Sequence, residues 1–148
     1  MTIRALCQRA RRDDGTAAIE VALLAPALIA IMLLVIAAMR IEVAGESVDA
    51  SAHDAARAAS ISRNAAEAQA NGVRAARTTL ASEGMNCSSL TVKVDASQFA
   101  RKLGEPATVR ATVTCVVALA DLSVPGLPGH KTITSTFTSP IDQYGGRS

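Results

Sequence analysis

The chain has 148 residues, of which 49% are hydrophobic and 2% aromatic, and its formal net charge is +2. This length allows one membrane span and one further domain of about a hundred residues. Nothing in the sequence combines a basic patch with aromatic residues, which argues against a nucleic-acid-binding protein. The scarcity of large aromatic side chains favours a thin domain with a long helix over a compact enzyme.

Residues 1–15 form a short basic segment that we expect to be a leader. Its basic residues are Arg4, Arg9, Arg11 and Arg12. The remainder, residues 16–148, has 11 basic and 11 acidic residues and is therefore neutral. Since the cytoplasmic flanks of membrane spans carry an excess of Lys and Arg, we predict a cytoplasmic N-terminus and an extracytoplasmic C-terminal part.

An unbroken apolar run follows, in which residues 21–39 include 19 consecutive positions without a polar side chain. As a helix this run spans about 28 Å, close to the roughly 30 Å of a bilayer core. A helix that is apolar all round cannot be buried in a domain of this size. We predict a transmembrane helix over residues 16–39, bent at Pro26 because proline removes a backbone hydrogen bond. A cleaved secretory signal peptide and an uncleaved signal anchor are the alternatives.

Glu20 is a charged residue at the start of this span, five residues after Gly15. An unpaired carboxylate deep in a bilayer costs on the order of 2.5–3.5 kcal/mol, so Glu20 either has a function or extends to the cytoplasmic interface. The basic leader, the glycine and the Glu at this offset resemble the type IV pilin class of prepilins. The stretch GTAAIEVALLAP over residues 15–26 is similar to the TadE-like pseudopilins of the tight-adherence (Flp) pilus system.

The resemblance implies a minor pseudopilin in the bacterial cell membrane or in a surface pilus used for adhesion. A prepilin peptidase would cut between Gly15 and Thr16, and Glu20 would pair with the freed Thr16 amine of a neighbouring subunit. The implied partners are this peptidase, other pilin or pseudopilin subunits, the pilus assembly machinery and the lipid membrane. The alternative is a single-pass, signal-anchored envelope protein whose outer domain is a binding module unrelated to pili.

Residues 40–83 are rich in alanine and lack proline, and we predict one extracytoplasmic helix here, loosened near Gly45 and Gly72. Its predicted apolar stripe consists of Ile41, Ala44, Val48, Ala52, Ala55, Ala59, Ala66, Ala70, Val73 and Leu80. Small residues allow another helix or a sheet to approach closely. The stripe therefore contacts either the protein's own domain or another subunit. Gly84 is the expected C-terminal cap of this helix.

Apolar and polar residues alternate three times within residues 84–140, which predicts a small antiparallel sheet of about three strands. Cys87 is expected in the loop before the first strand and Cys115 on the apolar face of the second. Both cysteines lie on the oxidising side of the membrane, where they can form a disulfide, with two free buried thiols as the alternative. Residues 141–148 are expected to be a loose tail, with Tyr144 as its one anchor.

No motif for catalysis or cofactor binding is present. His53 and His130 are isolated and there is no pair of closely spaced cysteines, so no metal site is expected. Asp121, Ser123 and His130 have no specific spacing for a catalytic triad. The sequence thus predicts an α+β protein that is not an enzyme and has no cofactor, small-molecule substrate or nucleic-acid partner.

Overall fold

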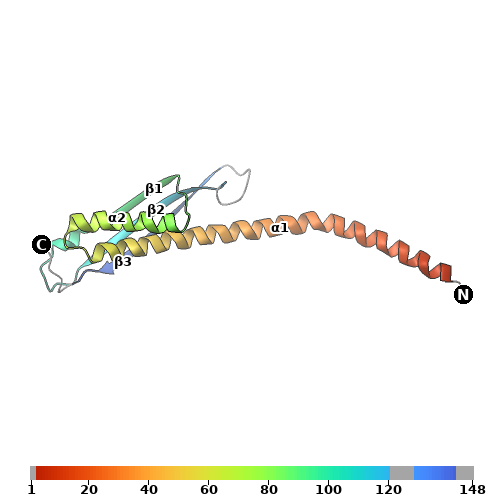
Figure 1. Ribbon diagram of the computed structural model, residues 1–148, viewed down its shortest axis with the longest axis horizontal. Coiled ribbons are helices and arrows are strands. Elements are labelled where there is room, and N and C mark those ends of the chain that lie inside the picture. The colour runs from red at the N-terminus through yellow and green to blue at the C-terminus, as the bar shows by residue number, and fades with distance from the viewer. Residues whose placement is uncertain (1–2, 121–128, 143–148) are drawn as a thin grey trace. The chain divides into compact units, whose positions relative to one another are not determined.

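The computed structural model describes residues 3–120 and 129–142, with side chains described from residue 19 onward. The chain divides into two compact units, Met1–Met39 and Arg40–Ser148. The first helix, α1, has the bounds Ile3–Ser60 (Figure 1). Its backbone is helical on both sides of residue 15, so no structural boundary separates the predicted leader from the predicted membrane helix.

The apolar part of α1 has no partner within the described residues of its own unit. The large side chains between residues 19 and 39 are all exposed, from 37% at Ile36 to 75% at Leu23. Among the described residues there is one helical stretch, Ile19–Ser60, that is long and apolar enough to cross a membrane. This stretch is a candidate membrane anchor, as the sequence predicts.

The prediction of one helix over residues 40–83 is wrong, because α1 ends at Ser60 and a second helix, α2, has the bounds Ala65–Ser82. Asn64 caps the start of α2, since its side-chain oxygen accepts a hydrogen bond from the Glu67 N–H at 2.9 Å. The Glu67 carboxylate in turn accepts from the Arg63 N–H at 3.2 Å. These side chains satisfy backbone groups that the interruption leaves without helical partners.

The break also changes which face of α2 is buried. Up to Ala59 the predicted stripe is buried or half-buried, but Ala66 and Ala70 are exposed. The buried residues of α2 are instead Ala68, Gly72, Ala76 and Leu80. A side chain at Gly72 would place its Cβ 2.9 Å from a methyl of Val94 and 3.1 Å from the Ala55 carbonyl oxygen. Gly72 therefore marks a close contact of α2 with α1 and the sheet, and not a loosened helix.

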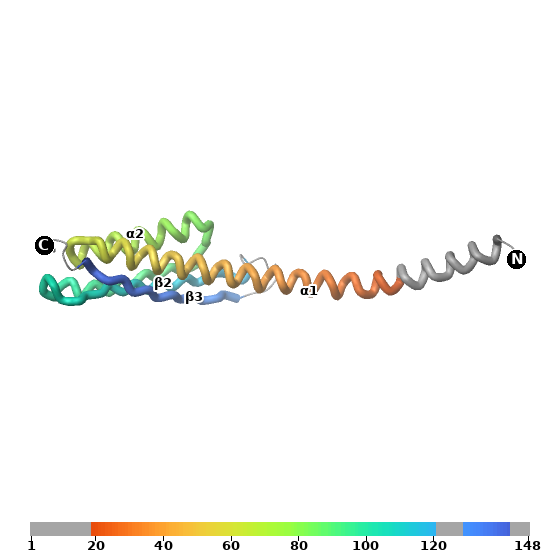
Figure 2. The backbone as a smooth tube through the Cα atoms, turned by 90° about the horizontal axis from the view of Figure 1, so that it is seen from below, coloured from red at the N-terminus to blue at the C-terminus, as the bar shows by residue number. Residues whose placement is uncertain are grey.

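Three strands form an antiparallel sheet in the order β1-β2-β3. Their bounds are Ser89–Asp95 for β1, Thr108–Ala118 for β2 and His130–Pro140 for β3. A 3-10 helix, η1, Ser97–Ala100, connects β1 towards β2. In Figures 1 and 2, α2 runs alongside the C-terminal part of α1, next to the sheet. This arrangement confirms the predicted α+β class and the three-stranded sheet.

The core lies between the two helices and one face of the sheet, with β2 at its centre. Alternate residues of β2 are buried, namely Val109, Ala111, Val113, Cys115 and Val117. Those from Ala111 to Val117 pack in one cluster with alanines of α1 and with Ala76 and Leu80 of α2. A smaller cluster surrounds Phe99 and includes Ile141. Alanine supplies most of the helix side of this core, so the helices lie close to the strands.

Backbone hydrogen bonds show where α2 ends and where the predicted tail begins. Gly84 has a φ of 66°, and the Met85 N–H donates to the Leu80 carbonyl at 2.9 Å, which confirms Gly84 as the terminator of the helix. Ile141 is buried and its N–H donates to the Ala107 carbonyl, so the predicted loose tail begins too early. Residues 143–148, which include Tyr144, lie outside the described residues.

Candidate functional site

The residues predicted for processing and subunit pairing all lie on α1. The backbone of Gly15 and Thr16 is helical, and Arg4, Arg9, Arg11 and Arg12 belong to the same helix further towards its N-terminus. Glu20 lies four residues after Thr16, so the two positions are one turn apart on the same helix face. In an intact chain the Glu20 position is therefore about one turn from the peptide bond that the predicted processing would cleave.

Glu20 is exposed, and its carboxylate has no hydrogen bond or ion pair with any residue in the described part of the chain. The apolar run begins directly after it. A carboxylate at the start of an apolar helix is stable where it is hydrated or paired with a cation. Pro26 lies inside α1, as predicted, and the helix continues through it.

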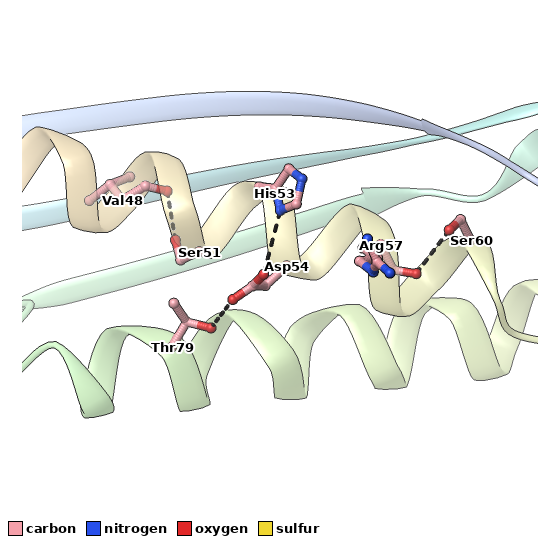
Figure 3. Close-up of polar contacts among 7 residues, drawn as sticks. All are labelled: Val48, Ser51, His53, Asp54, Arg57, Ser60 and Thr79. Carbon is pink, nitrogen blue, oxygen red and sulfur yellow. Dashed lines mark hydrogen bonds and ion pairs between the residues drawn. The ribbon is translucent and has the colours of Figure 1, made fainter.

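Within the second unit, polar contacts hold residues 40–60 of α1 against its neighbours. The Ser135 hydroxyl of β3 donates to the Asp49 carboxylate at 2.6 Å, and the Thr79 hydroxyl of α2 donates to Asp54 at 2.8 Å. His53 lies 3.5 Å from Asp54 (Figure 3). These contacts fix the rotation of α1 relative to β3 and α2. The Ser135–Asp49 and Thr79–Asp54 contacts were not predicted, because each joins elements that are distant in sequence.

Residues 15–57 match the model of a family described as TadE-like protein. The matched TadE-like segment includes Gly15, Thr16, Glu20 and Pro26, together with the whole apolar run. The match is consistent with a TadE-like protein and suggests an association with the tight-adherence pilus system. No curated protein and no solved structure matches the chain.

The match covers less than a third of the chain and ends before α2 and the sheet. The TadE-like segment therefore comprises the candidate anchor and the first helical layer of the second unit. Within that layer, Ala44, Val48, Ala52, Ala55 and Ala56 contribute to the core. The same stretch of sequence thus carries both the membrane signal and the surface on which the sheet packs.

The Cys87–Cys115 disulfide is present in the structure, with the two Cα atoms 5.4 Å apart. Cys87 lies between α2 and β1, as predicted from the strand parity, and Cys115 is fully buried at the centre of β2. The bond therefore connects the end of α2 to the middle strand. It does so next to Ser88, whose N–H donates to the Val116 carbonyl at 2.7 Å.

The sheet face opposite the helices is polar and carries paired threonines. Thr112 and Thr136 are hydrogen-bonded at 3.0 Å, and Thr114 and Thr134 at 3.1 Å. At the end of β1, hydrogen bonds from Ser97 lower the pKa of the exposed Asp95, and Arg110 acts in the same direction. Within the described residues, this face is a regular polar surface.

The described residues contain no group of three or more His, Cys, Asp and Glu side chains that could hold a metal ion. His130 lies at the start of β3, whereas Asp121 and Ser123 lie outside the described residues. The candidate site is the N-terminal part of α1, which carries Gly15, Thr16 and Glu20.

Proposed function

We propose that this protein is a minor pseudopilin that takes part in assembly of a tight-adherence pilus. The observation that carries the proposal is the TadE-like match over residues 15–57, because it covers the glycine, the carboxylate and the apolar helix together. The protein crosses the bacterial cell membrane once, with the arginine-rich N-terminus in the cytoplasm and residues 40–148 outside. It acts by packing against other subunits and not as an enzyme.

The first step of this function is cleavage by a prepilin peptidase after Gly15. A protease needs an extended peptide, whereas the backbone is helical at this position. Glycine in a helix is about 1 kcal/mol less favourable than alanine, so Gly15 is a point at which the helix opens at low cost. Glycine also has no side chain to clash with a narrow protease site.

The second step is pairing of Glu20 with a new N-terminus. Cleavage frees the Thr16 amine, which has a pKa of about 7.7–8.0 in water and is largely cationic at neutral pH. In a bundle of apolar helices, the Glu20 carboxylate of one subunit attracts the Thr16 amine of its neighbour strongly, because the surrounding dielectric constant is low. Such a pair sets the axial position of one subunit relative to the next.

The test is intact mass measurement and N-terminal sequencing of the protein from its own membranes. We expect a chain that begins at Thr16, and retention of the leader in cells that lack the prepilin peptidase. A Gly15→Val variant should keep residues 1–15, while the control Ala17→Val should be processed normally. A full-length chain starting at Met1 in cells with an active peptidase would contradict the proposal and leave an ordinary anchored envelope protein.

A further inference from the structure

An open groove of about 540 Å³ lies between α1 and α2 in the second unit. Part of its lining is apolar, from Ala58 of α1, Ile61 in the turn after it and Ala75 of α2. Ile61 is 79% exposed, the largest exposure of any large apolar side chain in the described residues. This residue lies just after the end of α1, where the break places it at the groove and not in the core.

The charged residues of this α1/α2 groove are two arginines and one aspartate. Asp54 is held by the Thr79 hydroxyl and His53 (Figure 3), so its charge is already partly compensated. Arg74 donates to the Asn71 side chain at 2.8 Å, a neutral partner. The Arg57 guanidinium makes no hydrogen bond or ion pair with any described residue. The groove therefore presents two exposed cations whose charge is not neutralised within the described chain.

A complementary surface lies earlier on α1. Glu42, Gly45, Glu46 and Asp49 are spaced at i, i+3, i+4 and i+7, so they form one helix face, which we call the acidic face. Glu42 and Glu46 have no polar partner among the described residues, while Asp49 accepts from Ser135. A Cβ added at Gly45 would meet nothing within 4 Å. The acidic face is thus open at its centre, where another helix can approach closely.

We infer that the α1/α2 groove binds the acidic face of a second copy of this chain. Arg57 and Arg74 lie opposite carboxylates in this pairing, and the apolar groove lining receives the helix at Gly45. The centres of the two surfaces, near residues 45 and 57, are about 18 Å apart along α1. Because the two surfaces differ, the contact is head-to-tail, and each new copy offers a free groove or a free acidic face to the next.

Exposed ion pairs are individually weak. The contact therefore depends on a high local concentration of copies, which a membrane or a growing assembly provides. It is expected to weaken with ionic strength, since the Debye length is about 8 Å at physiological salt. This inference uses only residues of the second unit and does not rest on processing at Gly15 or on the proposed pilus function.

The test uses the full chain at high concentration in detergent micelles, in which two copies are free to shift along the helix axis. A photo-crosslinking amino acid replaces Ile61 at the groove. After illumination and trypsin digestion, we expect a crosslinked dimer in which the probe is attached to the peptide of residues 41–57 of the second copy. No dimer, or attachment to another part of the chain, would overturn the inference.

Charge reversal then tests the pairing itself. Arg57→Glu with Arg74→Glu in the probe-bearing copy should lower the crosslink yield at least tenfold. Mixing this copy with one that carries Glu42→Arg and Glu46→Arg should restore the yield, which also shows that neither variant is misfolded. A yield that is unchanged by the first pair, or not restored in the mixture, would contradict the charge complementarity.

A steric variant provides an independent check. Gly45→Leu adds a side chain in open space of the single chain, so the fold should be kept while the second copy is blocked. The matched control is Ala66→Leu, on an exposed position of α2 that lines neither surface. We expect loss of the crosslink with the first variant only, at equal helix content by circular dichroism and an intact disulfide. Equal yields for both variants would overturn the inference.

Discussion

The two parts of α1 present opposite kinds of apolar side chain. Between residues 19 and 39 the side chains are large and exposed, as for Leu23 at 75%, whereas between residues 44 and 59 they are mostly small and buried, with Val48 and Ala52 at 0%. A helix with large exposed apolar side chains is suited to an apolar environment, either a bilayer or a bundle of other helices. Small buried ones allow the sheet and α2 to come close. The comparison shows that side-chain size can adapt two parts of one continuous helix to different environments, an apolar surrounding for residues 19–39 and the protein core for residues 44–59.

The largest effect is expected in the exposed part. Ile31→Arg places a charge near the middle of the apolar run, which costs about 4 kcal/mol in apparent insertion free energy. We expect most of the protein to be extracted from membranes by carbonate. The matched control, Ala66→Arg on an exposed position of the second unit, should stay membrane-bound. Retention of the Ile31 variant would mean that the run does not cross the bilayer.

The second effect concerns the disulfide of the alanine-rich unit. The double variant Cys87→Ala and Cys115→Ala opens a loop whose ends are 28 residues apart, and loop-closure entropy puts its contribution at about 3.6 kcal/mol. The thermal midpoint of the full chain in detergent, followed by circular dichroism, should fall clearly. The third cysteine, Cys7 in the predicted leader, provides the control Cys7→Ala, which should leave the thermal midpoint unchanged. Equal midpoints would show that the small-residue core is stable without the bond.

A third, smaller effect concerns the close contact of α2. Gly72→Val forces atoms against Val94 and the Ala55 carbonyl and should destabilise the second unit by about 2 kcal/mol. In contrast, Gly45→Ala meets no neighbour and should stabilise α1 by about 1 kcal/mol through helix propensity. Chemical denaturation of both variants measures the difference. Shifts of the same sign would contradict the assigned roles of these two glycines.

The smallest effect lies on the polar sheet face. The pKa of Asp95 is lowered by hydrogen bonds from Ser97, so this interaction stabilises the fold at pH values above the ordinary pKa of an aspartate. The stabilisation is lost as the pH falls through the lowered pKa. Ser97→Ala should move the pKa of Asp95 back towards its usual value, measured by NMR titration. Because Asp95 is exposed, the change in overall stability should be slight, and an unshifted titration would refute the assignment.

Local sequence patterns predicted the elements whose burial follows from the order of apolar and polar residues within the element itself. The apolar run depends only on composition, and the strands depend on alternation, so both were recoverable without tertiary contacts. The alternation of apolar and polar residues in β2 placed Cys115 on the buried face of the strand. The end of α2 was also predictable, because Gly84 adopts a backbone conformation that favours glycine.

The break between α1 and α2 was not predictable from periodicity alone. Residues 61–64 contain neither glycine nor proline, and the alanines on both sides fit one helical stripe. The interruption is stabilised by capping at Asn64 and by burial of Ala68, Ala76 and Leu80 against elements far away in sequence. Because the break changes which face of α2 is buried, Gly72 packs against α1 and the sheet, and Ile61 is exposed.

The sequence by itself thus determined the apolar helix and the three strands, because composition and spacing decide each of them locally. It favoured the Cys87–Cys115 disulfide but left two free thiols as the alternative. Only the tertiary structure decided the return of α2 along α1, the contact of Asp49 with Ser135 and the groove that contains Arg57 and Arg74. These features depend on which distant surfaces pack together. In a core built mainly of alanine, several faces of a helix could be buried with similar local free energies. Long-range packing selects one of these faces.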